Sequence, residues 1–493
     1  MRERPPARRR AAHALDGERD AETIRRLKAR SAQSARSARG AEPPPTMARR
    51  AAASLLAAMR ARNWVTGLVL PLVAAIVVGI ALVIVVGANS GSGGSAPSGL
   101  SAGFPPARDA AADFTGTGVT VDAIAASGVT EMAAGMAAGV PALWRSVNGG
   151  STWARAAGTT PTALRRAGKN QLTGVAHGAA GWLAVGGGTT TTAATSPATA
   201  TTAPVTSAAP PVVVGSPSGK AWTATDGEAA FTGPGLVTSA VAAGPAGYVI
   251  VGRQVSGGRT TAAAWYASGL TGWRRAAGAR AGALDGSGAR QMNAVTATAN
   301  GFAAVGSAGA RPAAWLSANG HTWSAVALPL PGDAASATLR YVAANGNTVV
   351  AAGTATTPAG AREPFAAVSA NGGASWSQTL LPEPRGGAAL VTALTAATSG
   401  FTAIGTYGPR GDKDVVLWLL PDNASAADQP RSASRAGSAA GWMLATPRGV
   451  GLAGAGTQAI TALTGVGATL TGIGFTATAA GTNPTLWQSP ART

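Results

Sequence analysis

Short apolar runs separated by glycine- or asparagine-bearing turns recur along most of the chain. Residues 291–329 show the unit clearly, as four runs with the sequences MNAVTATA, GFAAVGS, PAAWLSA and TWSAVAL. Apolar and polar positions alternate within these runs, and each run is bounded by turn residues. This alternation and this turn spacing predict a sheet of four antiparallel strands.

The same order of four runs begins seven times, near Val121, Gln171, Val237, Met292, Arg340, Val391 and Ala459. The shortest start-to-start spacing is 48 residues (292 to 340), and the longest is 68 residues (391 to 459). Repeats of this length with four strands each are typical of propeller blades. The sequence therefore predicts an all-β fold over residues 109–493, a seven-bladed β-propeller of four-stranded antiparallel blades.

Tryptophans fall at equivalent points of these repeats. They lie in the third run at Trp144, Trp265, Trp315, Trp418 and Trp487, and they open the fourth run at Trp153, Trp222, Trp273, Trp323, Trp376 and Trp442. Large aromatic side chains at fixed points of Ala/Val/Gly strands predict packing between blades. The seventh unit lacks a fourth run, so we predict that residues 109–118 pair with the last blade and close the ring.

A single long apolar segment precedes the repeats. No charged residue occurs between Arg62 and Arg108, and residues 64–88 are apolar over a length that spans a bilayer core. Arginines flank only the N-terminal side, which places that side in the cytoplasm. We predict a basic, largely disordered cytoplasmic tail (1–62), a transmembrane helix (63–88) and a Gly/Ser/Pro linker (89–108).

These boundaries lead to a single-pass plasma-membrane protein whose C-terminal propeller lies outside the cell. A cleaved signal peptide is the alternative, but the long basic lead and the long apolar run argue against it. A start at Met47 would shorten the tail without changing the topology. The Thr/Ala/Pro-rich insertion at 189–210 predicts a disordered loop, either inert or O-glycosylated.

Charge and composition narrow the candidate chemistry. The chain has a formal net charge of +19, yet 16 of its 39 Lys and Arg residues lie in residues 1–62, so the charge does not predict a nucleic-acid partner. There is no cysteine, which excludes disulfides and thiolate chemistry. The histidines show no metal-ligand spacing. We therefore expect no cofactor and no metal.

Three turns carry a recurring motif, SVNGGSTW (146–153), SANGHTW (317–323) and SANGGASW (369–376). The motif resembles the Asp-box, or BNR repeat, with asparagine where that family usually has aspartate. The matching residues are Ser146, Asn148, Gly150, Trp153, Ser317, Asn319, Trp323, Ser369, Asn371, Gly373 and Trp376. The resemblance implies a structural hairpin at the edge of a blade, away from the ring centre.

Families that share this box include sialidases, sortilin-type receptors and other carbohydrate-active enzymes, so the resemblance implies a fold and leaves the activity open. A sialidase would need an arginine triad, a tyrosine nucleophile and acidic partners, and no catalytic residue is assigned from the sequence. Arg253, Arg311 and Arg362 occupy similar loops between second and third strands and form a candidate surface patch.

The sequence favours a non-catalytic recognition or scaffolding propeller that binds a protein or a glycan on one face. A sialidase-like glycan-processing enzyme is the alternative, and a subunit of a membrane or envelope complex is a second alternative. The lining of the central channel discriminates between them. Small residues alone would favour binding, whereas a convergent cluster of arginine with tyrosine or a carboxylate would favour an enzyme.

Overall fold

The computed structural model describes residues 104–156, 164, 171–187, 211–225, 227–421 and 441–490. The predicted cytoplasmic tail, the transmembrane segment and the 189–210 insertion lie outside these residues. Within the described ranges, no helix combines the length and the apolar character that crossing a membrane requires. The membrane anchor therefore stays a prediction.

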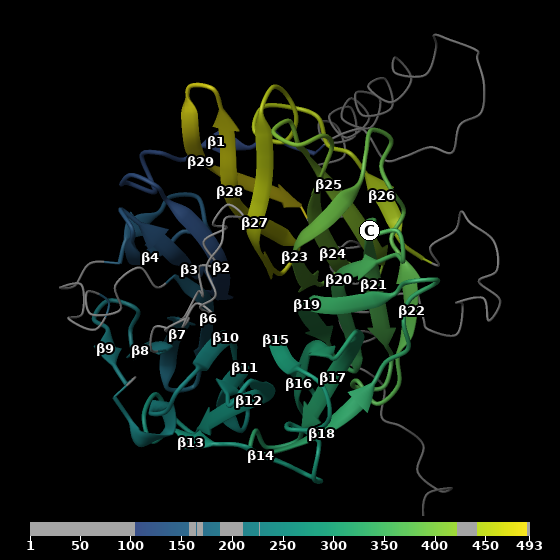
Figure 1. Cartoon of the computed structure of the whole chain (residues 1–493). Coiled ribbons are helices and arrows are strands. Elements are labelled where there is room, and N and C mark those ends of the chain that lie inside the picture. The colour runs from purple at the N-terminus through teal and green to yellow at the C-terminus, as the bar shows by residue number, and fades with distance from the viewer. Residues whose placement is uncertain are drawn as a thin grey trace, which may run out of the picture. The chain divides into compact units, whose positions relative to one another are not determined.

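Seven sheets are arranged in a ring around a central axis, where the propeller fold has its channel (Figure 1). From the channel outward, the first three blades are β2 (Thr120–Ser127), β3 (Thr130–Ala137), β4 (Val140–Ser146) and β5 (Ala154–Arg155); β6 (Leu172–Gly178), β7 (Gly181–Gly187), β8 (Pro211–Ser216) and β9 (Thr223–Ala224); and β10 (Leu236–Gly244), β11 (Gly247–Ser256), β12 (Arg259–Ala267) and β13 (Arg274–Arg275). A short 3₁₀ helix, η1 (Ala229–Phe231), links the second blade to the third.

The remaining blades follow the same order. They are β15 (Arg290–Thr298), β16 (Gly301–Ala308), β17 (Arg311–Ser317) and β18 (Thr322–Ala327); β19 (Ser336–Asn345), β20 (Thr348–Thr356), β21 (Arg362–Ser369) and β22 (Ser377–Leu380); β23 (Ala389–Ala397), β24 (Gly400–Tyr407), β25 (Asp414–Pro421) and β26 (Met443–Ala445); and β27 (Thr457–Val466), β28 (Thr469–Thr478) and β29 (Gly481–Pro490). The predicted seven-bladed propeller is confirmed.

Blade 4 has one strand more than predicted. The chain that leaves blade 3 forms β14 (Ala277–Gly278), which pairs in parallel with Thr322 and Trp323 at the start of β18. The rest of β18, from Ser324 to Ala327, has no strand on its outer side in the described sheet. This extra strand holds the connection between blades 3 and 4 against the outer edge of blade 4.

The N-terminal segment closes the ring, but the pairing strand lies earlier than the predicted 109–118, of which only Asp109 belongs to it. Strand β1 (Arg108–Asp109) pairs antiparallel with β29, with Arg108 opposite Leu486 and Asp109 opposite Thr485. Packing begins before this strand, because the Trp487 Nε1–H donates to the carbonyl of Pro105 at 3.0 Å. Residues 104–108, which the sequence assigns to the linker, thus include part of the closing contact with the last blade, and residues 110–119 form the loop that leads into blade 1.

Tryptophans pack between blades, as predicted. Trp265, Trp315 and Trp418 of the third strands are fully buried, and each belongs to a core cluster that draws on two neighbouring blades. The Nε1–H of Trp315 donates to the carbonyl of Ala283, in the connection that enters its blade, at 2.8 Å. Trp265 makes the corresponding bond to Ala230 at 2.7 Å. These contacts fix each interblade connection.

Every innermost strand contains a β-bulge near its beginning. The bulged residues, from blade 1 to blade 7, are Asp122, Thr173, Ser239, Asn293, Arg340, Thr392 and Thr461. A glycine of the second strand lies beside each bulge, at Gly135, Gly186, Gly252, Gly306, Gly353, Gly405 and Gly474. A Cβ at these glycines would lie only 1.8–2.2 Å from a backbone carbonyl oxygen of the first strand, so glycine is required there.

Candidate functional site in the central channel

The Asp-box of blade 1 is a closed network of hydrogen bonds within its own turn. The Gly150 N–H donates to Ser146 Oγ at 3.0 Å, and the Thr152 N–H donates to Asn148 Oδ1 at 3.0 Å. Trp153 Nε1–H returns to the Gly150 carbonyl at 2.9 Å. The asparagine amide also donates to the Thr152 hydroxyl at 2.9 Å, a bond that aspartate could not make.

The other two boxes are built in the same way. Gly373 N–H donates to Ser369 Oγ at 2.8 Å, and Asn371 Oδ1 accepts the Ser375 N–H at 2.9 Å. The remaining contacts repeat the first box, namely Trp376 Nε1–H to Gly373, Gly320 N–H to Ser317 Oγ, Thr322 N–H to Asn319 Oδ1 and Trp323 Nε1–H to Gly320. Because their polar groups are used within the turn, these hairpins offer little to a ligand.

The three candidate arginines lie at the ends of second strands or the starts of third strands in three consecutive blades. Arg253 is half-buried in β11, while Arg311 and Arg362 are exposed at the starts of β17 and β21. Arg311 lines a cavity of about 620 Å³ together with Arg280 and other residues. Arg362 lines a different cavity. Among the described pockets, none brings the three arginines together.

The bulged residues link neighbouring blades around the channel. Thr173 Oγ1–H donates to the carbonyl of Ser239, the bulged residue of the next blade, at 2.9 Å. Thr392 donates to the Ile460 carbonyl at 2.6 Å, and Thr461 donates across the closing seam to Val121 at 2.6 Å. Five of the seven bulged residues are Ser, Thr or Asn, which suits this bridging role. Asp122 and Arg340 differ from these five in carrying a charge, although Asp122 also bonds to the next blade through Gln171.

A third exception to the repeat pattern occurs at the residue that directly follows the bulge. It is small in six blades, and it is Tyr341 in blade 5. The small residues are Ala123, Gly174, Ala240, Ala294, Ala393 and Ala462. Blade 5 is separated from blade 1 by two blades on one side and three on the other, so β19 and β2 lie across the channel (Figure 1). The exceptional residues thus come from two facing strands.

These residues interact electrostatically. Burial raises the pKa of Tyr341, the nearby charge of Arg340 lowers it, and the charge of Asp122 raises it further. Burial also raises the pKa of Asp122, from 3.8 to about 6, although hydrogen bonds from Gln171 and Thr120 oppose this shift. The inner strands therefore carry a carboxyl with a pKa of about 6, the guanidinium of Arg340, and the phenol of Tyr341, which packs against the core cluster of blades 5 and 6.

The partners of Asp122 come from the beginnings of two neighbouring strands. Gln171 Nε2–H donates to Asp122 Oδ2 through a short hydrogen bond. The same amide lies 3.0 Å from Thr120 Oγ1. A carboxylate fixed by an amide from the next blade has a defined position in the channel before any ligand arrives, which favours a binding or catalytic role over a mobile surface charge.

Sequence reasoning missed Asp122, Gln171, Arg340 and Tyr341 as a site. A signal was present, because aligning the seven inner strands on the second-strand glycine would have exposed the two charged bulge positions and the single tyrosine. No local signal reports that blades 1 and 5 face each other. Among the residues that the structure describes, no three His, Asp or Glu side chains are grouped to hold a metal ion.

Comparison with known proteins gives only distant structural similarities. No family model matches the chain, and no curated protein matches it. Among solved structures, an ancestral GH74 enzyme is similar with a TM-score of 0.40 and 12% identity, over 75% of this chain and 48% of that one. The chain thus spans about half the length of that enzyme.

Two further similar solved structures are a sialidase and a lectin. A Trypanosoma rangeli sialidase bound to sialic acid matches with a TM-score of 0.36 and 10% identity, over 81% of this chain and 59% of that one. A fucose-specific lectin from Aleuria aurantia matches with a TM-score of 0.36 and 13% identity, over 68% and 96%. Similarity at this level carries no argument about activity, so the function has to be inferred from the site.

Proposed function

We propose that this propeller processes a glycan in its central channel, using Asp122, Arg340 and Tyr341. One observation carries the proposal. The three residues that depart from the repeat pattern of the inner strands come from opposite blades, and the charges of Asp122 and Arg340 both shift the pKa of Tyr341. Structural demands on the fold would repeat in every blade, so departures of this kind indicate a function that only one part of the ring performs.

The chemistry of the three groups fits glycoside hydrolysis. A carboxyl with a pKa of about 6 is partly protonated near neutral pH, so Asp122 can donate a proton to a glycosidic oxygen. Asp122 is the only carboxylate in the seven inner strands, which leaves no pair of carboxylates there. A tyrosine nucleophile is the known exception to the two-carboxylate mechanism; burial raises the pKa of Tyr341, and the charge of Arg340 opposes that rise in part.

The substrate class follows from the same groups. Arg340 can form a bidentate contact with a sugar carboxylate, and the tyrosine ring offers an apolar face to the C–H groups of a pyranose. An acidic sugar would therefore meet a complementary charge in the channel.

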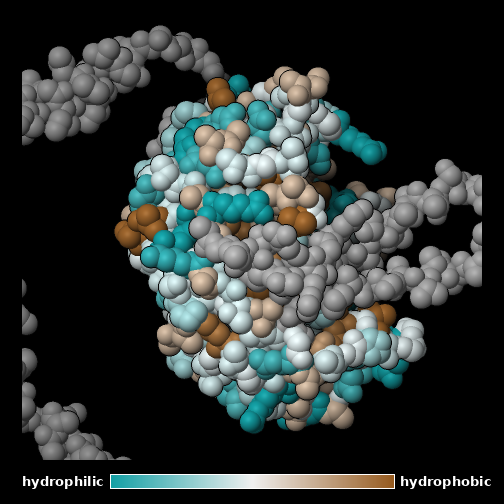
Figure 2. All heavy atoms as spheres, turned by 90° about the vertical axis from the view of Figure 1, so that its left-hand side faces the viewer, coloured by the Kyte–Doolittle hydropathy of each residue, from teal (hydrophilic) through white to brown (hydrophobic). Residues whose placement is uncertain are grey.

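Non-catalytic recognition of a glycan or a protein is the second candidate. Burial raises the pKa of Tyr341, which works against a phenolate nucleophile and favours a binding role for the ring. The exposed large apolar side chains of the described surface are few, namely Val129, Val147, Val255, Leu380 and Val450, and Figure 2 shows small apolar areas on one side of the molecule. A polar ligand in the channel suits this surface better than a broad apolar interface.

A substrate panel tests both candidates. The full chain is assayed with aryl glycosides of neutral and acidic sugars, alongside Asp122→Asn, Tyr341→Phe and the control Tyr407→Phe, which changes a tyrosine outside the inner strands. We expect turnover that declines above pH 6 and that falls at least ~10²-fold in the two channel variants. Saturable glycan binding without turnover, weakened in the same variants, would establish recognition instead. Absence of both would refute the proposal.

The location of the site relative to the membrane is part of this proposal. We propose that residues 64–88 anchor the chain in the plasma membrane and that the propeller lies outside the cell, where extracellular glycans are accessible. The apolar character of this segment and the arginines before it support this placement. Association with other envelope proteins through the same segment is compatible with it, and recovery of one stoichiometric membrane partner would support that association.

A further inference from the structure

A second site lies at blade 4, between its sheet and the connection that enters the blade. A cavity of about 620 Å³ is bounded by the 279–287 connection on one side and by the blade 4 sheet on the other. Its charged side chains are Arg280, Arg290 and Arg311, and no carboxylate lines it. This volume is in the range of small-molecule binding sites.

The sheet register brings two of these arginines together. Arg290 in β15 and Arg311 in β17 are both paired with Ala308, which lies between them in β16. Paired residues of adjacent strands point to the same face of a sheet, so the two arginines flank a small residue at a Cα separation of roughly 10 Å. The methyl group of Ala308 leaves the space between the two guanidinium groups open.

This arginine pair is particular to blade 4. The position of Arg290 is taken in the other described blades by buried residues without charge, namely Val119, Leu236, Ala337, Ala389 and Gln458. The position of Arg311 is taken by residues without positive charge, namely Val140, Thr261, Glu363, Asp414 and Asn483. The fold itself therefore does not require either arginine.

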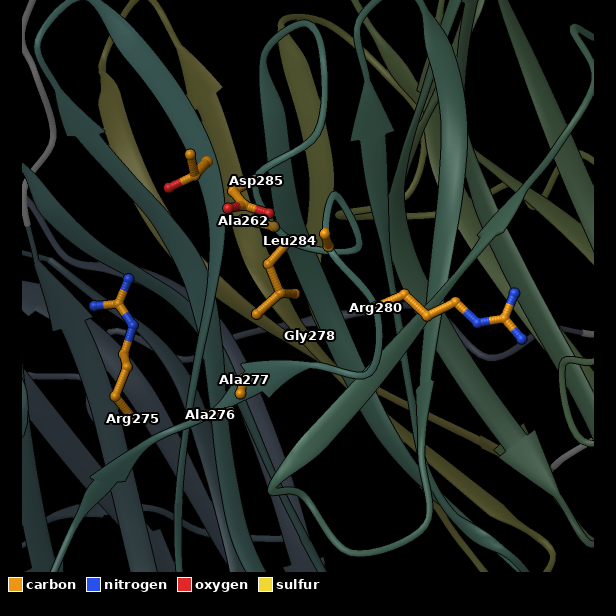
Figure 3. A pocket seen from close by; sticks show the side chains of 10 residues that line it. Ala262, Arg275, Ala276, Ala277, Gly278, Arg280, Leu284 and Asp285 are labelled. Carbon is orange, nitrogen blue, oxygen red and sulfur yellow. The ribbon is translucent and has the colours of Figure 1, made fainter. Parts of the chain in front are cut away.

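The arginines lack counterions. Within the described part of the chain, Arg280, Arg290 and Arg311 form no ion pair, and Arg290 Nε is buried without a hydrogen-bond partner. Asp285 is the carboxylate of the same connection, but its Oδ1 accepts the Gly282 N–H at 3.1 Å. Figure 3 shows the Arg280 side chain extending away from Asp285. Three guanidinium groups around one cavity repel each other unless an anion joins them.

The cavity wall is fixed in advance. Ala283 of the connection accepts a hydrogen bond from Trp315 of blade 4 at 2.8 Å, and Leu284 accepts one from Ala262 of blade 3 at 3.0 Å. A Cβ at Gly286 would lie 2.5 Å from an Arg290 guanidinium nitrogen, so the glycine leaves room for this side chain. A preformed wall reduces the ordering cost of binding.

From these observations we infer that the blade 4 cavity binds an oxyanion, a phosphate, sulfate or carboxylate group. The cavity has room for a carrier of sugar size in addition to the anionic group. Arginine donors arranged around a cavity match the oxygens of such groups and form charge-assisted hydrogen bonds with them. This site is separate from the channel and does not depend on the glycan-processing proposal.

Titration calorimetry on the full chain tests the inference, with inorganic phosphate, inorganic sulfate, glucuronate and a hexose phosphate as probes at constant ionic strength. We expect saturable binding of at least one probe, weakened roughly 10-fold or more in Arg311→Gln. Gly286→Ala should weaken it as well, by displacing Arg290 without changing any charge. The control Arg274→Gln removes an exposed charge from β13 and should leave the affinity unchanged.

The relative affinities of the probes distinguish a free anion from an anionic group carried by a sugar. Tighter binding of the hexose phosphate than of phosphate would assign the site to an anionic sugar, whereas equal affinities would assign it to the free ion. Both results support the oxyanion site. No saturable binding of any probe, or equal weakening in Arg274→Gln, would overturn it, because general electrostatic attraction would then explain the data.

Discussion

Glu131→Gln should stabilise the propeller at neutral and alkaline pH. Glu131 lies in β3 at the seam between the first and last blades, with only 1% of its surface exposed. Its Oε1 accepts a hydrogen bond from the Thr471 hydroxyl at 3.2 Å, whereas Oε2 is buried without a partner. Gln488 donates to the neighbouring Gly149 carbonyl at 2.7 Å, so the amide nearest the carboxyl is already engaged.

The magnitude follows from the pKa of this carboxyl. Burial raises it from 4.5 to about 6, and the hydrogen bond from Thr471 opposes that shift only in part. A folded-state pKa above the unfolded value means that the folded protein binds more protons, so stability is lost as pH rises from 4.5 through 6. At ~1.36 kcal/mol per unit, the ionised carboxylate lowers the free energy of unfolding by about 2 kcal/mol above this range.

Glutamine keeps the shape and the acceptor oxygen of Glu131 and cannot ionise. We therefore expect Glu131→Gln to match the wild type below pH 4.5 and to exceed it by about 2 kcal/mol at pH 8. For a folded unit of about 400 residues this corresponds to a rise in Tm of about 2–3 °C.

Thermal unfolding followed by circular dichroism from pH 4 to pH 8 measures this difference. Asp122 titrates in a similar range, so only the difference between the wild type and the variant reports on Glu131. The control Glu383→Gln removes a carboxylate that is exposed to solvent and should give a curve without this step. Parallel curves for the wild type and Glu131→Gln, or a lower Tm of the variant at pH 8, would refute the reasoning.

Three further predictions concern closure, the bulges and the anchor. Phe114→Ala removes a ring whose centroid lies 5.4 Å from that of Trp144 at the closing seam. We expect it to lower the free energy of unfolding, measured with denaturant, by about 3–5 kcal/mol. A loss below ~1 kcal/mol would contradict the packing argument. Gly306→Ala should destabilise by at least ~2 kcal/mol because its Cβ would meet the Gln291 carbonyl, whereas Gly269→Ala, with open space around it, should stay within ~0.5 kcal/mol. Deletion of residues 64–88 should move the protein from the carbonate-resistant membrane pellet to the soluble fraction, and retention in the pellet would contradict the anchor.

The architecture was predictable because its determinants are local and repeated. A tryptophan equivalent to Trp315 marks the third strand of a blade, and a glycine in a turn marks the end of a strand. Because these signals recur along the chain, they support a single interpretation of the fold. Ring closure by residues near 109 was predictable for a similar reason, since the seventh unit visibly lacked a strand. Asp109 indeed pairs with Thr485.

The candidate site was not predictable in the same way. The closeness of Asp122 and Tyr341 depends on the ring geometry, which places blades 1 and 5 across a channel. The arginine pair of Arg290 and Arg311 depends on strand register, which the bulge at Asn293 shifts by one residue. Cross-ring closeness depends on how the seven blades assemble, so the pattern of each repeat marks these polar residues one by one, and only an alignment of the seven inner strands would have singled them out.

The antiparallel order of the blades separates structural from functional residues. Asp-box turns join third to fourth strands. They therefore lie at the opposite end of each blade from the hairpins that join second to third strands. The bulges and the glycines beside them lie near the second-to-third hairpins, and so do Asp122, Arg340 and the Arg290–Arg311 pair. At the Asp-box edge, side chains such as Asn148 are bonded within their own turns. At the other edge, the charged groups differ from blade to blade, and Arg290 and Arg311 form no ion pair within the described residues. Both proposed sites therefore open toward the same face of the propeller, and a ligand approaching that face would meet the groups that the fold does not use.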